Sequence, residues 1–176
     1  RGWCFCEASV SNLAKESDFV LDLGKFSGTE RHLFEIVGKC RIQRRPPISP
    51  QQFRLELSTK SFTSKAADEK KVSNLYKGKF EAQLGTAKEF DSSNLDWGDE
   101  ELAVLAQALA TEALPNLATL DLLSNKIGDG GCTALAKACA AGALPKLVTL
   151  FLPDNKIGDG GCTALAKACA AGALPK

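Results

Sequence analysis

A phrase of 22 residues occurs twice in this chain, and it constrains the fold more than any other feature. Residues 125–146 and residues 155–176 both read NKIGDGGCTALAKACAAGALPK. The similarity extends upstream to Leu117 and Leu147, which gives a period of 30 residues. A period of this length indicates stacked structural units, because one such unit cannot bury its own apolar face.

Each unit opens with the pattern LxxLxLxxNxI. In the first unit it is carried by Leu117, Leu120, Leu122, Asn125 and Ile127. Leu120 and Leu122 alternate with outward-facing positions, which predicts a short strand with one buried face. We expect Asn125 and its equivalent Asn155 to turn their amides inward, satisfy backbone groups where the chain leaves the strand, and form an asparagine ladder between repeats.

A helix is expected after each strand. Asp129 is the expected N-cap, Gly142 the residue that ends the helix, and Pro145 prevents its continuation. The cysteines lie seven residues apart on the predicted apolar face, which is a spacing for core residues rather than for metal ligands. We therefore predict structural roles for Cys132, Cys139, Cys162 and Cys169.

The LxxLxLxxNxI pattern, followed by a long unit ending in ALAKAC, resembles the ribonuclease-inhibitor-like subclass of leucine-rich repeats over residues 90–176. The resemblance implies an α/β fold: a short right-handed solenoid with a parallel sheet on its concave side and helices outside, which usually binds other proteins. Trp97-Gly-Asp99 aligns with Ile127-Gly-Asp129, so residues 86–114 are interpreted as a divergent first repeat. Its expected strand at Phe90-Asp-Ser-Ser is poor, and Asn94 is one residue out of register.

The two complete units differ at only four positions, all in or just after the strand: Ala118/Val148, Asp121/Phe151, Leu123/Pro153 and Ser124/Asp154. One interpretation is a concave face diversified for ligands. The other is a recent duplication in which only residues 125–146 were homogenised. The candidate partner-binding residues are those that face outward on the two strands: Thr119, Asp121, Leu123, Thr149, Phe151 and Pro153.

The first half of the chain predicts a mostly helical α+β region. Residues 3–15 are expected to be helical, residues 19–23 to form a short strand, and residues 32–37 to form either a strand or a short helix. Ser49-Pro50 begins a helix, and another runs from Asp68 to Leu84 with Val72, Leu75, Tyr76 and Phe80 on its apolar stripe. Residues 26–85 are interpreted as a linker and capping region that shields the first edge of the repeat sheet.

Trp3-Cys4-x-x-Glu7, followed by a helix and a strand, resembles one segment of Toll/interleukin-receptor (TIR) domains. The resemblance implies that residues 1–25 are a remnant of an upstream α/β domain. In the NAD-cleaving members the equivalent of Glu7 is the catalytic carboxylate. The alternative is that Trp3 and Phe5 are packing residues and that Glu7 is a solvated acid in the first helical turn. The strands that would complete the pocket are absent from this sequence, so we expect no NAD cleavage.

Composition excludes several function classes. There are 22 lysines and arginines against 21 acidic residues, so no global field points to nucleic acid or to an anionic membrane. The apolar runs are too short for a membrane span. His32 is the only histidine, and neither a catalytic set, a metal site nor a cofactor motif is visible. Seven cysteines without paired spacing predict a reducing, cytoplasmic compartment.

We therefore expect a non-enzymatic interaction module that binds a protein partner, not yet identified, through the concave face of its repeats. Two alternatives are the C-terminal part of a TIR-like NAD-cleaving signalling protein with the repeats as sensor, and a regulator of a small GTPase. The chain starts at Arg1 without methionine, and residues 173–176 repeat the lead-in to a further strand. We expect that the natural protein continues past Lys176, or that the chain self-associates through its uncapped last repeat.

Overall fold

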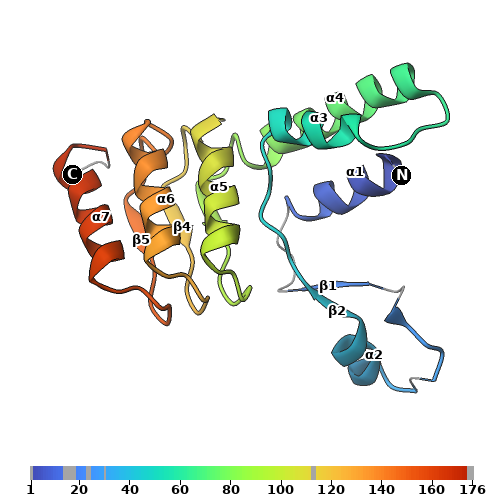
Figure 1. Ribbon diagram of the computed structural model, residues 1–176, viewed down its shortest axis with the longest axis horizontal. Helices are drawn as coiled ribbons and strands as arrows, with labels where there is room; N and C mark the ends of the chain where they lie inside the picture. The colour runs from blue at the N-terminus through green and yellow to red at the C-terminus, as the bar shows by residue number, and fades with distance from the viewer. Residues whose placement is uncertain (1, 14–18, 23–24, 30, 112–113, 174–176) are drawn as a thin grey trace.

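A computed structural model describes residues 2–13, 19–22, 25–29, 31–111 and 114–173 (Figure 1). Within these residues the first half forms four helices and two short strands, and the second half alternates strand and helix. In chain order the elements of the first half are α1 (Gly2–Ser11), β1 (Phe19–Leu21), α2 (Leu33–Cys40), β2 (Arg41–Gln43), α3 (Pro50–Ser58) and α4 (Lys65–Gln83). Those of the second half are β3 (Glu89–Asp91), α5 (Asp99–Thr111), β4 (Thr119–Asp121), α6 (Asp129–Ala140), β5 (Thr149–Phe151) and α7 (Asp159–Ala170).

The second half is a parallel sheet of three strands in the order β3-β4-β5, covered on one face by α5, α6 and α7 side by side (Figure 1). Leu120 pairs in register with Phe90 on one side and with Leu150 on the other, so each step across the sheet is one 30-residue unit. The segment expected to be a poor strand is therefore β3. Phe90 fits there because its ring is buried in the core while its two neighbours face solvent.

Helix α6 shows how each unit closes. Its inner side buries Cys132, Leu135 and Cys139, as the spacing predicts. The helix ends in a Schellman motif: the N–H of Gly142 donates to the carbonyl of Cys139 (2.8 Å) and the N–H of Ala143 to that of Ala138 (3.1 Å). Gly142 has φ +84°, a conformation that glycine adopts at no steric cost.

The hydrophobic core is continuous from the N-terminal helices into the repeats. The rings of Phe53 and Tyr76 stack with centroids 4.0 Å apart, and Trp97 of the first repeat is buried in the same cluster. The indole N–H of Trp97 donates to the carbonyl of Arg44 at 2.7 Å. This bond fixes the segment between β2 and α3, residues 44–49, against the repeats; the segment is called the connector below. The N-terminal region thus packs on the first repeat through side chains, while among the described strands β3 pairs only with β4.

The N-terminal elements differ from expectation at several positions. The helix expected over residues 3–15 is α1, and residues 14–18 lie outside the described residues. The strand expected over residues 19–23 is β1, which pairs antiparallel with β2. Residues 32–37 belong mostly to helix α2, which resolves the alternative between strand and helix. Ser49 caps α3 by accepting from the N–H of Gln52 at 3.1 Å, as predicted.

Two side chains lie elsewhere than the sequence suggests. Leu75, expected on the buried stripe of α4, is 43% exposed, because the helix packs by the narrower stripe of Val72, Tyr76 and Phe80. Arg44 lies in the basic sequence Arg41 to Arg45, a composition typical of a solvated surface, yet it is 4% exposed. Its guanidinium donates to the carbonyl of Asn12 at 3.1 Å, at the C-terminal end of α1, where the helix dipole favours a cation.

Candidate interaction surface

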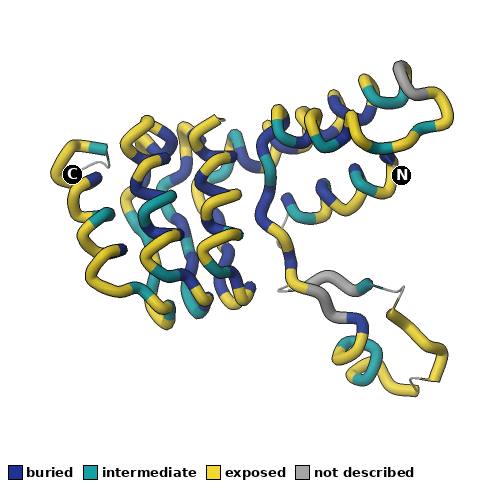
Figure 2. Tube along the Cα trace, viewed as in Figure 1, coloured by how far each residue is buried: buried dark blue, intermediate teal, exposed yellow. Residues whose placement is uncertain are grey.

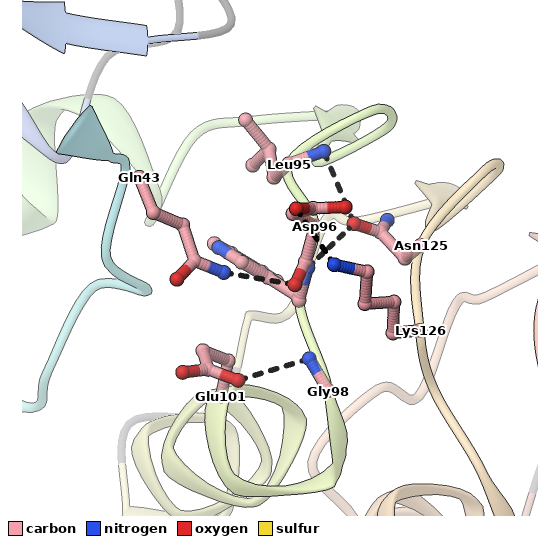
Figure 3. A network of polar contacts seen from close by, with 8 residues as sticks. Gln43, Leu95, Asp96, Gly98, Glu101, Asn125 and Lys126 are labelled. Carbon is pink, nitrogen blue, oxygen red and sulfur yellow. Dashed lines mark hydrogen bonds and ion pairs between the residues drawn. The ribbon is translucent and has the colours of Figure 1, made fainter. Parts of the chain in front are cut away.

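Asparagine side chains organise the turns after β4 and β5, and Figure 3 shows the first of them, the buried Asn125. The Nδ2 of Asn125 donates to the carbonyls of Ser92 (2.8 Å) and Leu122 (3.0 Å). Its Oδ1 accepts from the N–H groups of Leu95 (3.1 Å) and Trp97 (3.0 Å). One amide therefore satisfies backbone groups of its own repeat and of the preceding one, in a site from which water is excluded.

Asn155 makes the same contacts one repeat later. Its Nδ2 donates to the carbonyls of Leu122 and Leu152, both at 2.9 Å, and its Oδ1 accepts from the N–H of Ile127 at 3.0 Å. In the first repeat the equivalent position is Leu95, which is buried. That repeat thus has no ladder amide of its own and depends on Asn125.

Asn94 occupies a different position, the one before the ladder. Its φ is +55°, and its equivalents Ser124 and Asp154 have φ +52° and +54°. Asparagine and aspartate tolerate this left-handed conformation better than most residues. Asn94 therefore does not mark an insertion. It occupies the turn position that Ser124 and Asp154 hold in the next two repeats.

A second ladder is made of carboxylates, and it corrects the expected role of Asp129. Asp129 does not cap its own helix, whose N-cap is Gly128. Its Oδ1 accepts instead from the N–H of Gly158 in the next repeat at 2.7 Å, as Asp99 Oδ1 accepts from Gly128 at 2.6 Å. Each aspartate thus reaches forward to the start of the following helix, where the helix dipole favours negative charge.

The glycines of the GDGG sequence make room for these carboxylates. A Cβ at Gly130 would lie 2.7 Å from Asp99 Oδ2, and one at Gly131 would lie 2.9 Å from Asp99 Oδ1. In the next repeat a Cβ at Gly160 would lie 2.7 Å from Asp129 Oδ2. The Gly-Asp-Gly-Gly sequence that the two units share therefore meets a steric and hydrogen-bonding requirement of stacking on the preceding repeat.

The two ladders join neighbouring repeats and so keep their strands aligned. The face of the sheet that α5, α6 and α7 leave uncovered is here called the helix-free face. Its strand positions are Glu89 and Asp91 on β3, Thr119 and Asp121 on β4, and Thr149 and Phe151 on β5. Thr119, Asp121, Thr149 and Leu123 are half-buried, Pro153 is exposed, and the ring of Phe151 is 46% exposed. The six candidate partner-binding residues therefore lie on one continuous surface.

Two of the four differences between the repeats are chemically linked on this face. Asp121 Oδ1 accepts from the backbone N–H of Leu123 at 2.9 Å, and Asp91 Oδ1 accepts from that of Ser93 at the same distance. In the last repeat Phe151 has replaced the acceptor, and Pro153 has no N–H to donate. Acceptor and donor are lost together, so no buried donor is left unpaired and an aromatic ring is exposed instead.

Comparison with known families agrees with this geometry. Residues 113–136 and 143–166 match the family described as Leucine Rich repeat. These two segments are leucine-rich repeats. A search of curated proteins finds no match, and neither does a search of solved structures.

The repeat cysteines divide into two environments. Cys132 and Cys139 are buried between α5, α6 and α7, and burial raises the pKa of each thiol to about 11. They are neutral near pH 7 and act as small apolar groups. Cys162 and Cys169, expected in the core, are exposed, because no described element packs on the far side of α7 (Figure 2).

Glu7 and Trp3 both lie on the exposed side of α1. Phe5 is the packing residue of this segment, with its ring stacked on Phe53 at a centroid distance of 5.0 Å. The structure brings no second carboxylate, histidine or cysteine beside Glu7 in a set that could hold a metal, and no such set occurs elsewhere among the described residues.

An open groove between the N-terminal helices and the first repeat was not foreseen from sequence. It has a volume of about 930 Å³ and is lined by residues of α1, the connector, α3 and the start of α5, among them Ser9, Arg44, Pro47, Glu56, Glu101 and Val104. Pro46 and Pro47 line this groove, and the sequence signals them only as a Pro-Pro pair that favours an extended backbone. Asp96, in the turn after β3, contacts both neighbours of the first repeat (Figure 3). Its carbonyl accepts from Nε2 of Gln43, at the end of β2, at 2.9 Å, and its carboxylate pairs with Lys126 of the next repeat at 2.8 Å.

The helices that the structure describes include none with the length and apolar character required to cross a bilayer.

Proposed function

We propose that this protein is a non-enzymatic interaction module that binds a protein partner through the helix-free face, which corresponds to the concave side of a leucine-rich-repeat solenoid. Leucine-rich repeats generally mediate protein–protein interaction. The observation that carries the proposal for this face is the pair Phe151 and Pro153. Their ring surfaces are presented to solvent where the preceding repeat holds a closed Asp121–Leu123 turn.

The chemistry of the face suits protein recognition. Exposed aromatic rings beside polar groups are enriched among residues that contribute most to protein–protein affinity. The strand backbone and the asparagine ladder hold these side chains in place before a partner arrives, so little conformational entropy is lost on binding. The outward-facing strand positions can change without disturbing the repeat core, since Leu120 and Leu122 are the side chains that this part of the repeat buries.

The test is a partner capture compared across three forms of the protein. The double variant Asp121→Ala/Phe151→Ala removes the charge and the ring from the face. The control Leu55→Ala removes a side chain that is 60% exposed on α3, away from the sheet. Proteins recovered by wild type and by the control, and lost with the double variant, support the proposal. Equal recovery with all three forms contradicts the helix-free face as the binding surface.

The end of the sheet at β5 supports a second, self-associating contact. Leu120 and Leu122 are fully buried, whereas their equivalents Leu150 and Leu152 are half-buried, and β5 has a strand neighbour on one side only among the described strands. We expect a second copy to cover this end. A concentration series by analytical ultracentrifugation tests it: Cys162→Glu, which places a charge on exposed α7, is expected to abolish a dimer. A wild type that is monomeric at all concentrations contradicts self-association.

The thirty-residue unit with a helix of twelve residues supports assignment of these repeats to the ribonuclease-inhibitor-like subclass. A reducing compartment such as the cytoplasm is supported by the cysteines, because all seven are free thiols. Titration of thiols in the unfolded protein, isolated without reductant, is expected to find all seven. Loss of thiols in pairs contradicts this assignment.

A further inference from the structure

The edge of β4 that faces the last repeat is closed by main-chain hydrogen bonds. The N–H groups of Leu122 and Ser124, just after β4, donate to carbonyls of the last repeat at 2.9 and 3.0 Å. The carbonyl of Ala118, just before β4, accepts from the N–H of Val148 at 2.9 Å. β4 therefore shows which main-chain groups a strand of this sheet offers to its next neighbour, and how they are satisfied.

The equivalent edge of β5 is open. Its groups lie thirty residues further along the chain: the N–H groups of Leu152 and Asp154 and the carbonyl of Val148. No described residue forms a hydrogen bond with any of these three groups. Leu150 lies between them and directs its main-chain groups to the same side, because alternate residues of a strand do so. Such an edge is a template for a further strand, which would satisfy these groups.

The apolar layer behind this edge is open as well. On α7 the residues equivalent to the buried stripe of α6 are exposed or half-buried, namely Cys162, Leu165, Ala166 and Cys169 (Figure 2). The stripe contains no charged residue, so a second copy of the same stripe can face it without repulsion between like charges. The N-terminal helices lie at the other end of the molecule and leave the approach to α7 and β5 unobstructed (Figure 1).

We infer that two copies of the chain join at this edge by antiparallel pairing of their β5 strands about a two-fold axis. This rests on the self-association proposed above and specifies its contact. The open groups select the register in which Phe151 lies opposite Phe151 of the second copy. The N–H of Asp154 in each copy then faces the carbonyl of Val148 in the other. The N–H of Leu152 likewise faces the carbonyl of Leu150.

The neighbouring register satisfies fewer groups. With Leu150 opposite Leu150 of the second copy, Asp154 would lie opposite Lys146, which precedes the strand by three residues. The N–H of Asp154 would then have no strand carbonyl to meet. The accounting of donors and acceptors therefore favours the register centred on Phe151.

This contact changes the surface on which the partner is proposed to bind. The two three-stranded sheets become one, with the two α7 helices side by side and antiparallel on the same face of it. The helix-free faces of the two copies join at the axis. Phe151 forms a non-hydrogen-bonded pair with its counterpart, with Cα atoms about 4.5 Å apart, so the rings meet across the axis. Each copy thus supplies half of one apolar patch.

Disulfide mapping tests the register. The parent form carries Cys4→Ala, Cys162→Ala and Cys169→Ala, which remove the three exposed thiols. Into it Phe151→Cys, Thr149→Cys or Pro153→Cys is introduced, and oxidised glutathione serves as the oxidant that converts two thiols into a disulfide. Non-reducing electrophoresis measures covalent dimer at a concentration where the parent form sediments as a dimer.

Phe151→Cys is expected to cross-link by itself, because its Cα lies within the roughly 4.4–6.8 Å that a disulfide spans. Thr149→Cys and Pro153→Cys are expected not to cross-link separately, since each lies four residues, about 13 Å, from its own counterpart. Mixed together they are expected to cross-link, because Thr149 of one copy lies opposite Pro153 of the other. Equal cross-linking of the three single forms overturns the register and with it the inference.

A charge exchange at the axis gives an independent readout. Phe151→Lys and Phe151→Glu each place like charges opposite each other, and the dimer of either form is expected to be at least about tenfold weaker than wild type by sedimentation. An equimolar mixture of the two forms is expected to recover most of the association. The control Leu55→Lys adds a charge on α3, away from the sheet, and is expected to change nothing. A mixture no stronger than its components contradicts the pairing.

The outcomes separate this inference from the self-association on which it rests. A wild-type dimer that shows neither the Phe151→Cys cross-link nor the charge exchange overturns β5 pairing and leaves self-association through another contact. A wild type that is monomeric at all concentrations overturns both, and leaves the edge to a strand of a different protein. Neither result alters the partner capture that judges the helix-free face.

Discussion

Asp129 Oδ1 accepts a hydrogen bond from the backbone N–H of Gly158 at 2.7 Å, and so joins the start of one helix to the start of the next. The same contact joins Asp99 to Gly128 at 2.6 Å. Asp159 has the same sequence context in the last repeat, but no described residue lies beyond it to donate. The chain therefore contains its own control for the energy of this contact.

Asp129→Ala is expected to lower the free energy of unfolding by about 1–2 kcal/mol, because a charge-assisted hydrogen bond between repeats is lost. Asp159→Ala removes the same carboxylate from the same helix position without losing that bond, so its effect is expected to be near zero. Urea unfolding of both variants gives the comparison. Equal destabilisation would mean that the carboxylate acts on its own helix and not across the repeats.

The asparagine ladder predicts unequal effects at equivalent positions. Asn125→Ala leaves the N–H groups of Leu95 and Trp97 unpaired in the core, and we expect a loss of about 3 kcal/mol. Asn155 is only half-buried, so Asn155→Ala is expected to cost less, about 1 kcal/mol. Chemical denaturation measures both. A larger loss at Asn155 contradicts the role assigned to Asn125.

Gly130→Ala tests the space reserved for Asp99. Replacing an interior helical glycine by alanine ordinarily stabilises by about 0.5–1 kcal/mol, and Gly78→Ala in α4, where nothing lies within 4 Å, is expected to do so. At Gly130 the new Cβ meets Asp99 Oδ2 at 2.7 Å, so the sign reverses. Adding Asp99→Ala removes the obstructing carboxylate and should recover part of the loss. A stabilising Gly130→Ala would refute the steric explanation.

Part of this fold and of its candidate surface can be predicted from the sequence, and part cannot. The strand at Leu120 and Leu122 and the buried stripe of α6 follow from spacing alone, because periodicity reports which face is buried. The role of Asp129 could not be found that way. Its partner lies 29 residues away, and an aspartate before two glycines looks like a helix cap on local rules. The buried position of Arg44 is not visible in the sequence either, since only the fold brings it to the end of α1.

The linked change of Asp121 to Phe151 and of Leu123 to Pro153 predicts non-additive mutations. Phe151→Asp alone provides an acceptor without a donor, and Pro153→Leu alone provides a donor without an acceptor. Together they recreate the Asp121–Leu123 turn in the last repeat, so the double-mutant cycle is expected to show a favourable coupling of about 1 kcal/mol. Thermal or urea unfolding of the four forms measures it. Strict additivity contradicts the link.

The buried thiols predict a loss of stability at alkaline pH. Burial raises the pKa of Cys132 and Cys139 from 9.0 to about 11, so the folded state holds these protons more tightly than the unfolded state. Their contribution to stability is complete below pH 9 and is lost as pH rises from 9 to 11. Cys139→Ala should reduce this slope, and Cys162→Ala, which changes an exposed thiol, should not. Equal slopes for the two variants argue against it.

We expect the partner to bind on the helix-free face at Asp121 and Phe151. The most direct measurement is isothermal titration of a captured partner against wild type, Asp121→Asn/Phe151→Ala and Leu55→Ala, with folding of each verified by circular dichroism. The affinity is expected to be at least about tenfold lower for the double variant and unchanged for Leu55→Ala. Equal affinity for all three forms would contradict it.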